Sequence, residues 1–337
     1  MAWTRRLAGA VLVVAVTAGA AGCGSGGDDR LVVYSGRSRD LIGPLLDDFS
    51  DKAGVGIDVR YGDSADLALL IDEEGDRTPA DVFISQSPGA VGFLDGAARL
   101  GPLSQAIVDL VPEGDAAADN TWVGLSGRVR TLVYNTDLVD PAALPGSVLD
   151  LTGDDFAGRV ALAPTNASFQ DFVTVLRDEI GDEDTRGWLE GMAAGDPPTF
   201  ENNTAIVEAV GRGEVPMGLV NHYYALRATS DDPDLPVANH FFPEGDLGST
   251  LLVTAAAILE GTDQREDAER LVEFLLSAEA QRFFSDETFE YPLAEGAEAN
   301  EALPPLDQIS ATRVELDELG GGLEATTQMI DESGLAG

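Results

Sequence analysis

The feature that most constrains the fold is an alternation of strand-like and helix-like segments along the chain. Residues 31–34 form a β-branched run, and apolar residues at helical spacing follow within 41–49. The pattern continues with a strand-like run at 55–61, a helix-like run at 67–71 and a strand-like run at 81–85. Strands that alternate with helices predict a parallel sheet covered by helices on both faces.

Two long extended segments interrupt this alternation. Residues 122–134 and 249–258 are each long enough to pass from one lobe of a protein to another. The sequence therefore predicts an α/β fold, a two-lobed clamshell in which two crossover strands form the hinge. Beyond the first series we expect strands at 160–163 and 215–220 and helices at 169–180, 185–194, 203–210 and 267–284.

These crossings define the predicted domains. The predicted parts are lobe 1 at 31–126 plus 250–300, lobe 2 at 127–249, and a C-terminal extension at 301–337. Within the extension, the Pro-rich 303–305 and the Gly-rich 320–322 are expected to flank a helix.

The N-terminus has the pattern of an export signal. Arg5 and Arg6 precede an apolar or small-residue stretch at 7–21, and the segment ends in Ala-Ala-Gly-Cys23, which resembles a bacterial lipobox. We therefore expect residues 1–22 to be a lipoprotein signal peptide, Cys23 to carry the lipid, and residues 23–30 to be a flexible tether. The predicted location is the outer face of the cell membrane. The alternative is an ordinary cleaved signal with a free cysteine.

Charge and cysteine content exclude several classes of partner and site. Acidic residues outnumber basic ones by 60 to 20, giving a formal net charge of −40, which disfavours binding to nucleic acid or to anionic membrane surfaces. Contact with the membrane is thus expected through the lipid anchor only. A single Cys excludes an internal disulfide framework and any multi-cysteine zinc or iron–sulfur site.

Ligands of such folds lie beyond the carboxyl ends of the strands, which here means the cleft between the lobes. The predicted strand ends carry two arginines, Arg37 and Arg128, and an adjacent pair of tyrosines, Tyr223 and Tyr224. A hard ion such as Fe(III) favours anionic oxygen ligands, whereas softer divalent metals favour His or Cys. The chain has only two histidines. Phenolate coordination of iron is therefore one interpretation of the tyrosine pair, and ordinary packing is the other.

An ordered set of motifs makes the interpretation specific. The set comprises Glu-Gly-Asp-Arg-Thr-Pro-Ala-Asp-Val-Phe at 74–83, Leu-Ser-Gly-Arg at 125–128, Gly-Glu-Val-Pro at 213–216 and Asn-His-Tyr-Tyr at 221–224. Over about 31–306 the chain resembles the ferric-ion-binding solute-binding proteins of bacterial ABC transporters. The resemblance implies a type II periplasmic-binding-protein fold and delivery of Fe(III) to a membrane permease that a cytoplasmic ATPase powers. We expect a monomer.

The resemblance also implies roles for individual residues. Tyr223 and Tyr224 correspond to the iron-ligating pair. Asn203 and Asn221 fall where family members contact a synergistic anion, carbonate or phosphate, and the turn from Asn166 to Ser168 matches the anion-cradling turn in position.

The chain also departs from the family pattern. Ser38 and Gln86 stand where some members have a His and a Glu ligand. We therefore expect water or another phenolate to complete the iron shell, with Tyr34 and Tyr61 as candidates, although both are also typical of packed strand residues. Arg37 and Arg128 are candidate anion partners because a guanidinium matches carbonate geometry; the alternative for each is a structural salt bridge.

Other functions remain as alternatives. A binding protein of the same fold could carry a metal-free oxyanion, thiamine or a polyamine. Tyr-Gly-Asp-Ser at 61–64 resembles the opening block of GDSL-type hydrolases, but such chemistry needs a histidine base, and none follows His240. We therefore expect no enzyme, and we expect the motif to cap a helix.

Overall fold

The structure, a computed structural model, describes residues 30–309, 312–313 and 322–336. The predicted signal peptide, Cys23 and nearly all of the predicted tether lie outside the described residues. None of the helices in the described ranges is both long enough and apolar enough to cross a bilayer.

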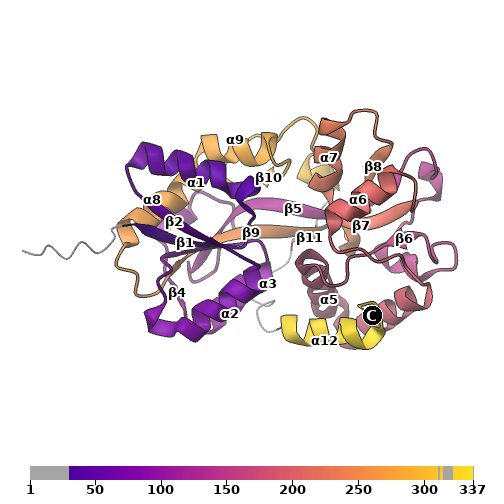
Figure 1. The fold of residues 1–337 in the computed structure, drawn as a ribbon, viewed down its shortest axis with the longest axis horizontal. Coiled ribbons are helices and arrows are strands. Elements are labelled where there is room, and N and C mark those ends of the chain that lie inside the picture. The colour runs from indigo at the N-terminus through magenta and orange to yellow at the C-terminus, as the bar shows by residue number, and fades with distance from the viewer. Residues whose placement is uncertain (1–29, 310–311, 314–321, 337) are drawn as a thin grey trace, which may run out of the picture.

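Lobe 1 is built on the three parallel strands at the start of the chain (Figure 1). Its main elements are β1 (Leu31–Ser35), β2 (Ile57–Tyr61), β3 (Val82–Ser85), β4 (Leu100–Gly101), α1 (Arg39–Ala53), α2 (Ser64–Glu74), α3 (Pro88–Gly96), α4 (Gln105–Val108), α8 (Arg265–Leu275), α9 (Ala278–Asp286) and β10 (Tyr291–Pro292). Side chains alternate across the strands. Val33 and Ile84 therefore enter one apolar cluster, and Tyr34 and Phe83 enter the cluster on the other face.

Lobe 2 has its own strands and helices. They are β6 (Val160–Ala161), β7 (Met217–Asn221), β8 (Val237–His240), α5 (Ala167–Ala194), α6 (Asn203–Gly211) and α7 (His222–Asp231). Its sheet also separates two apolar clusters, one around Leu219 and Phe172 and one around Val220 and Ile206. Each lobe is thus a sheet with a core on both faces, as the alternation of segments predicts.

Two long antiparallel strands connect the lobes, and Figure 1 shows them running side by side between the two halves. They are β5 (Trp122–Asn135) and β9 (Thr250–Leu259). Residues 122–129 of β5 pair with β9, whereas residues 130–135 pair with β7 and β8. The strand order β2-β1-β3-β9-β5-β7-β6 therefore forms one continuous path through both lobes. The two predicted crossover strands are β5 and β9; the exact domain boundaries remain a prediction.

One predicted helix differs from the observed structure, and one predicted pair agrees with it. The predicted helix at 267–284 is two helices, α8 and α9, because Ser277 caps a new helix by accepting a hydrogen bond from the amide of Ala280. The two helices predicted within 169–194 are confirmed as the two halves of α5, which meet at Gly181, where φ is 84° and the backbone is not helical.

The C-terminal extension returns to both lobes. Within it the structure describes α10 (Leu306–Ile309), β11 (Thr312–Arg313), which pairs with β9, and α12 (Leu323–Ser333). The stretch predicted to be helical, between 305 and 320, lies mostly outside the described residues. The longer helix that is described, α12, follows the glycines and packs on α5, where Thr326 and Thr174 share a hydrogen bond of 2.8 Å.

Candidate metal and anion site

A cavity of about 150 Å³ lies between the lobes, at the carboxyl ends of β1, β3 and β7. Both lobes contribute to its lining, which comprises Gly36, Asp63, Ser64, Gln86, Ser87, Arg128, Asn166, Ala167, Ser168, Asp171, Asn221 and Tyr224. Its position is the one predicted from the strand ends. A larger groove of about 690 Å³ between α2, α3 and α12 is mostly apolar and contains none of the predicted ligands.

The tyrosine pair lies in the first turn of α7, directly after β7 ends at Asn221. Tyr224 lines the cavity, and the Tyr223 ring stacks on it with 4.2 Å between ring centroids. Tyr223 is fully buried, and within the described residues its hydroxyl has no hydrogen-bond partner. A buried phenol normally finds one. Burial raises the pKa of Tyr223 well above its usual value of 10, Tyr224 and Glu290 raise it further, and Arg128 opposes them.

Arg130, which the sequence analysis did not select, organises the predicted anion residues. Its Nη1 donates to Oδ1 of Asn221 at 3.2 Å, to Oδ1 of Asn203 at 3.4 Å and to Oγ of Ser168 at 3.2 Å. Its Nη2 donates to the carbonyl of Leu219 at 3.1 Å. These contacts are all to neutral groups. Burial lowers the pKa of Arg130 to about 9, which Tyr224 and Asp171 oppose, so the guanidinium is still cationic at neutral pH.

This arrangement fixes the orientation of both asparagine amides. Because their Oδ1 atoms accept from Arg130, their Nδ2 groups point elsewhere. Asn203 Nδ2 donates to Oδ1 of Asn166 at 3.1 Å and to Oγ of Ser168 at 3.0 Å. Asn221 Nδ2 is buried without a partner among the described residues. A buried, unpaired donor on the cavity wall, in front of a buried cation, favours an anionic ligand.

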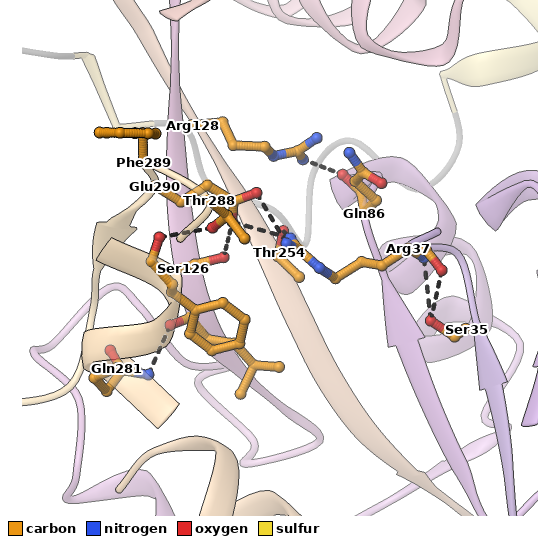
Figure 2. Close-up of polar contacts among 12 residues, drawn as sticks. Ser35, Arg37, Gln86, Ser126, Arg128, Thr254, Gln281, Thr288, Phe289 and Glu290 are labelled. Atoms are coloured by element: carbon orange, nitrogen blue, oxygen red, sulfur yellow. Dashed lines mark hydrogen bonds and ion pairs between the residues drawn. The ribbon is translucent and has the colours of Figure 1, made fainter. Parts of the chain in front are cut away.

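Arg128 and Arg37, the two predicted anion partners, lie in different places. Arg128 lines the cavity and donates to the main-chain carbonyl of Gln86 (Figure 2). Arg37 is fully buried behind the cavity, where Nη1 and Nη2 bind the two carboxylate oxygens of Glu290, each at 2.9 Å, and Nη1 also binds Thr254. Of the two alternatives considered for Arg37, anion partner and structural salt bridge, its contacts match the salt bridge. Burial would raise the pKa of Glu290, but Arg37, Arg128 and Ser126 outweigh it, and the net pKa is lowered.

The structure does not bring Tyr34 or Tyr61 to the cavity. The Tyr34 hydroxyl donates to Glu74 at 3.3 Å, and its ring packs under the guanidinium of Arg60. The Tyr61 ring packs under Arg39, 5.1 Å from the ring centroid to Cζ. Packing, the alternative considered for both side chains, accounts for these contacts.

No histidine is placed to act as a base or as a ligand in the cavity. His222 is fully buried; its Nδ1 accepts from the amide of Val129 at 3.0 Å and its Nε2 donates to the carbonyl of Phe289 at 2.8 Å. Burial lowers its pKa to about 4. Ser64, the candidate nucleophile of the hydrolase-like motif, accepts from the Gln86 amide, and Asp63 caps α2 as predicted. Across the described residues, no group of three or more His, Cys, Asp or Glu could hold a metal.

The model of the family "Bacterial extracellular solute-binding protein" matches residues 77–313 of the chain. The chain belongs to this family. This solute-binding protein is 29% identical over 312 residues to the major ferric iron-binding protein of Neisseria meningitidis, covering 90% of this chain and 93% of the relative. It is 26% identical over 311 residues to the Fe(3+)-binding periplasmic protein of Serratia marcescens, covering 91% of each.

Solved structures confirm the predicted two-lobed fold. Iron-bound HitA from Pseudomonas aeruginosa is 30% identical, with a TM-score of 0.86, and the match covers 90% of this chain and 99% of HitA. The relatives are binding proteins rather than enzymes, in agreement with the expectation that this solute-binding protein has no catalytic activity. Membership in an extracellular family and the periplasmic relatives also support the predicted export.

Sequence reasoning missed Arg130 and Asp171 as residues of the site. A signal for Arg130 was present, because Ser126, Arg128 and Arg130 alternate in a mostly apolar strand and therefore share one face. Asp171 follows Ser168 by three residues on the same helix face. The contact between Ser87 and Asp171 joins residues 84 positions apart, and no local pattern predicts it.

Proposed function

We propose that this protein is the Fe(III)-binding subunit of an ABC importer, which captures ferric ion between its lobes and delivers it to a permease. The observation that carries the proposal is the pair of stacked phenols, one of them on the wall of a cavity at the strand ends and the other buried with an unpaired hydroxyl. The names of the relatives support the same substrate.

Tyr223 and Tyr224 are the proposed iron ligands. Because burial raises the pKa of Tyr223 well above 10, its phenol is protonated in the metal-free protein, and iron must displace this proton. A trivalent ion has the charge needed to do so. Ser38 and Gln86 supply neither imidazole nor carboxylate, so the synergistic anion and water complete the coordination shell.

The proposed anion is carbonate or phosphate, held where Asn166 and Ser168 begin α5. The dipole of α5 favours an anion at its N-terminus, and Arg130 and Arg128 add positive charge nearby. The amide of Ser168 already donates to Oδ1 of Asn166, so these charges supply most of the attraction. The unpaired amide of Asn221 is a further donor. The cavity holds the volume of roughly five water molecules, at ~30 Å³ each. It suits a metal ion with a small anion better than thiamine, because pockets for drug-sized ligands are roughly 300 Å³ or larger.

The proposed transport cycle uses the hinge strands. The open cleft admits iron and anion, closure excludes water, and docking on the permease and its ATPase reopens the lobes. Differential affinity of the open and closed states allows both capture and release. We further propose that the mature protein is a monomer held at the membrane by a lipid on Cys23.

The test of the substrate is metal binding by the purified wild-type protein. With ferric citrate and bicarbonate, we expect one iron per chain and a visible absorption band from phenolate-to-iron charge transfer. Zinc and copper at equal concentration should not displace the iron. Preparations that contain stoichiometric zinc, or an organic ligand without any metal, would contradict the proposed substrate.

Removal of the charge on Arg130 tests the anion. In Arg130→Met, we expect iron binding to lose its dependence on added carbonate or phosphate and to weaken by roughly 10- to 100-fold, the range for outer-shell partners of metal ligands. Iron titrations with and without each anion measure the effect. Arg159→Met, which removes an arginine that donates to the Asp155 carbonyl at an exposed contact, is the matched control. Unchanged anion dependence in Arg130→Met would contradict this role.

A further inference from the structure

Two buried side chains from opposite lobes meet at the wall of the cavity. Ser87, which immediately precedes α3 in lobe 1, donates a hydrogen bond of 2.6 Å from Oγ to Oδ1 of Asp171 in α5 of lobe 2. Each residue is only 3% exposed. Both line the same cavity as Tyr224. The bond therefore ties the lobes together beside the proposed ligands, and moving the lobes apart would break it.

An apolar contact continues this connection one turn further along α5. Val175 lies four residues after Asp171 and therefore on the same face of the helix. It is fully buried and belongs to the apolar cluster of lobe 1 that includes Ile71 and Phe83. Asp171 and Val175 thus form an α5 seam against lobe 1. Opening the clamshell breaks the hydrogen bond and exposes both side chains to water.

We propose that Asp171 is a proton-linked latch, which holds the closed lobes together through Ser87 and takes up a proton as they close. The proposal rests on the proposed function only for its effect on iron retention. The equilibrium between the open and the closed lobes exists in the metal-free protein and does not require iron.

The surroundings of Asp171 determine the direction of the linkage. The charged and titratable groups that face it are Arg128 and Arg130 from β5, Asp63 before α2, and Tyr224 from α7 on the same cavity. Burial raises the pKa of Asp171 to about 7 from its usual 3.8; Ser87 and the arginines lower it, and Asp63 adds to the rise. No charged partner of Asp171 is within ion-pair distance among the described residues, so burial prevails.

When the lobes separate, water reaches the carboxyl group and its pKa falls back toward 3.8. The closed state therefore binds the proton more tightly than the open state does. The preference of the proton for the closed state is fully present below about pH 3.8, declines as the pH rises from there, and is lost above about 7. Between pH 6 and pH 8, this linkage lowers the equilibrium constant for closure by about tenfold.

The test measures closure in metal-free protein, so that it does not depend on iron. Spin labels at Asp51→Cys in α1 and Leu138→Cys in lobe 2, both exposed positions, report the interlobe distance in a Cys23→Ser background. We expect the ratio of closed to open protein to fall about tenfold from pH 6 to pH 8. In Asp171→Asn, which still accepts a bond from Ser87 but cannot ionise, the ratio should stay constant within about twofold. The same pH dependence in both proteins overturns the proposal.

A second measurement follows iron release into excess chelator. Ser87→Ala and Asp171→Ala should release iron about tenfold faster, because each removes the interlobe bond, while the wavelength of the iron band stays unchanged. Asp182→Ala is the matched control, since it removes an exposed carboxylate of the same element, α5, that bonds Arg177 away from the cavity. Release at the wild-type rate from both alanine variants overturns the latch. A wild-type protein that binds no iron would instead refute the proposed function, and the distance measurement would still decide the latch.

Discussion

Replacing both Tyr223 and Tyr224 with Phe is expected to abolish the visible iron band and to weaken iron binding by more than about a thousandfold. Both changes remove proposed direct ligands, and even outer-shell partners of metal ligands contribute about 10- to 100-fold each. Competition against a chelator of known affinity measures the loss. Folding should not suffer, because the Tyr223 hydroxyl has no hydrogen-bond partner among the described residues and Phe fills the same space.

Tyr61→Phe is the matched control for the double variant, since Tyr61 is a further tyrosine predicted as a candidate ligand and the structure places it away from the cavity. The band and the affinity of Tyr61→Phe should equal those of the wild type. A double variant that keeps its colour would show that other groups bind the metal. A Tyr61→Phe protein that loses its colour would contradict the site described above.

The buried pair of Arg37 and Glu290 is expected to show the largest effect on stability. Arg37→Met leaves the Glu290 carboxylate buried without its bidentate partner, which should cost about 3–5 kcal/mol in the free energy of unfolding. Denaturant titration measures the cost. In the double variant Arg37→Met with Glu290→Gln, the buried charge is gone, and most of the lost stability should return.

The exposed pair of Arg212 and Glu214 provides a control of the same chemistry. Arg212→Met should leave the midpoint of the denaturant titration nearly unchanged, since solvent screens the charges of an exposed pair. Folded Arg37→Met protein should bind iron and anion with wild-type affinity if Arg37 is structural. Equal stabilities of the wild type and Arg37→Met, or a loss of anion dependence, would reverse this assignment.

Arg37 and Arg128 show which features of the site the sequence predicts and which it does not. The period of the apolar residues was enough to predict the strands, most of the helices and the two crossings, because burial on two faces imposes that period. Arg37 follows the end of β1 and Arg128 lies within β5, and both were predicted as anion partners. Their roles differ because Glu290, 253 residues after Arg37 in the sequence, lies beside Arg37 and binds it. Arg128 instead lines the cavity.

The same limit applies within the site. The place of the tyrosine pair and of Asn221 at the cleft could be predicted because they lie where β7 ends and α7 begins. Their proposed roles, and the choice of Asn203, came from the family resemblance. Arg130 and Asp171 take their roles from partners on other elements. Such contacts depend on the packing of whole lobes, which a single sequence without its structure does not specify.

The two strands that join the lobes have a consequence for how the molecule loses its structure. β9 lies between β3 of one half and β5, whose far end pairs with β7 of the other half, so neither sheet is complete without this shared ribbon. The two lobes are therefore expected to unfold together in one cooperative transition rather than as two independent domains. Local unfolding of β5 and β9 would remove strands on which the sheets of both lobes depend.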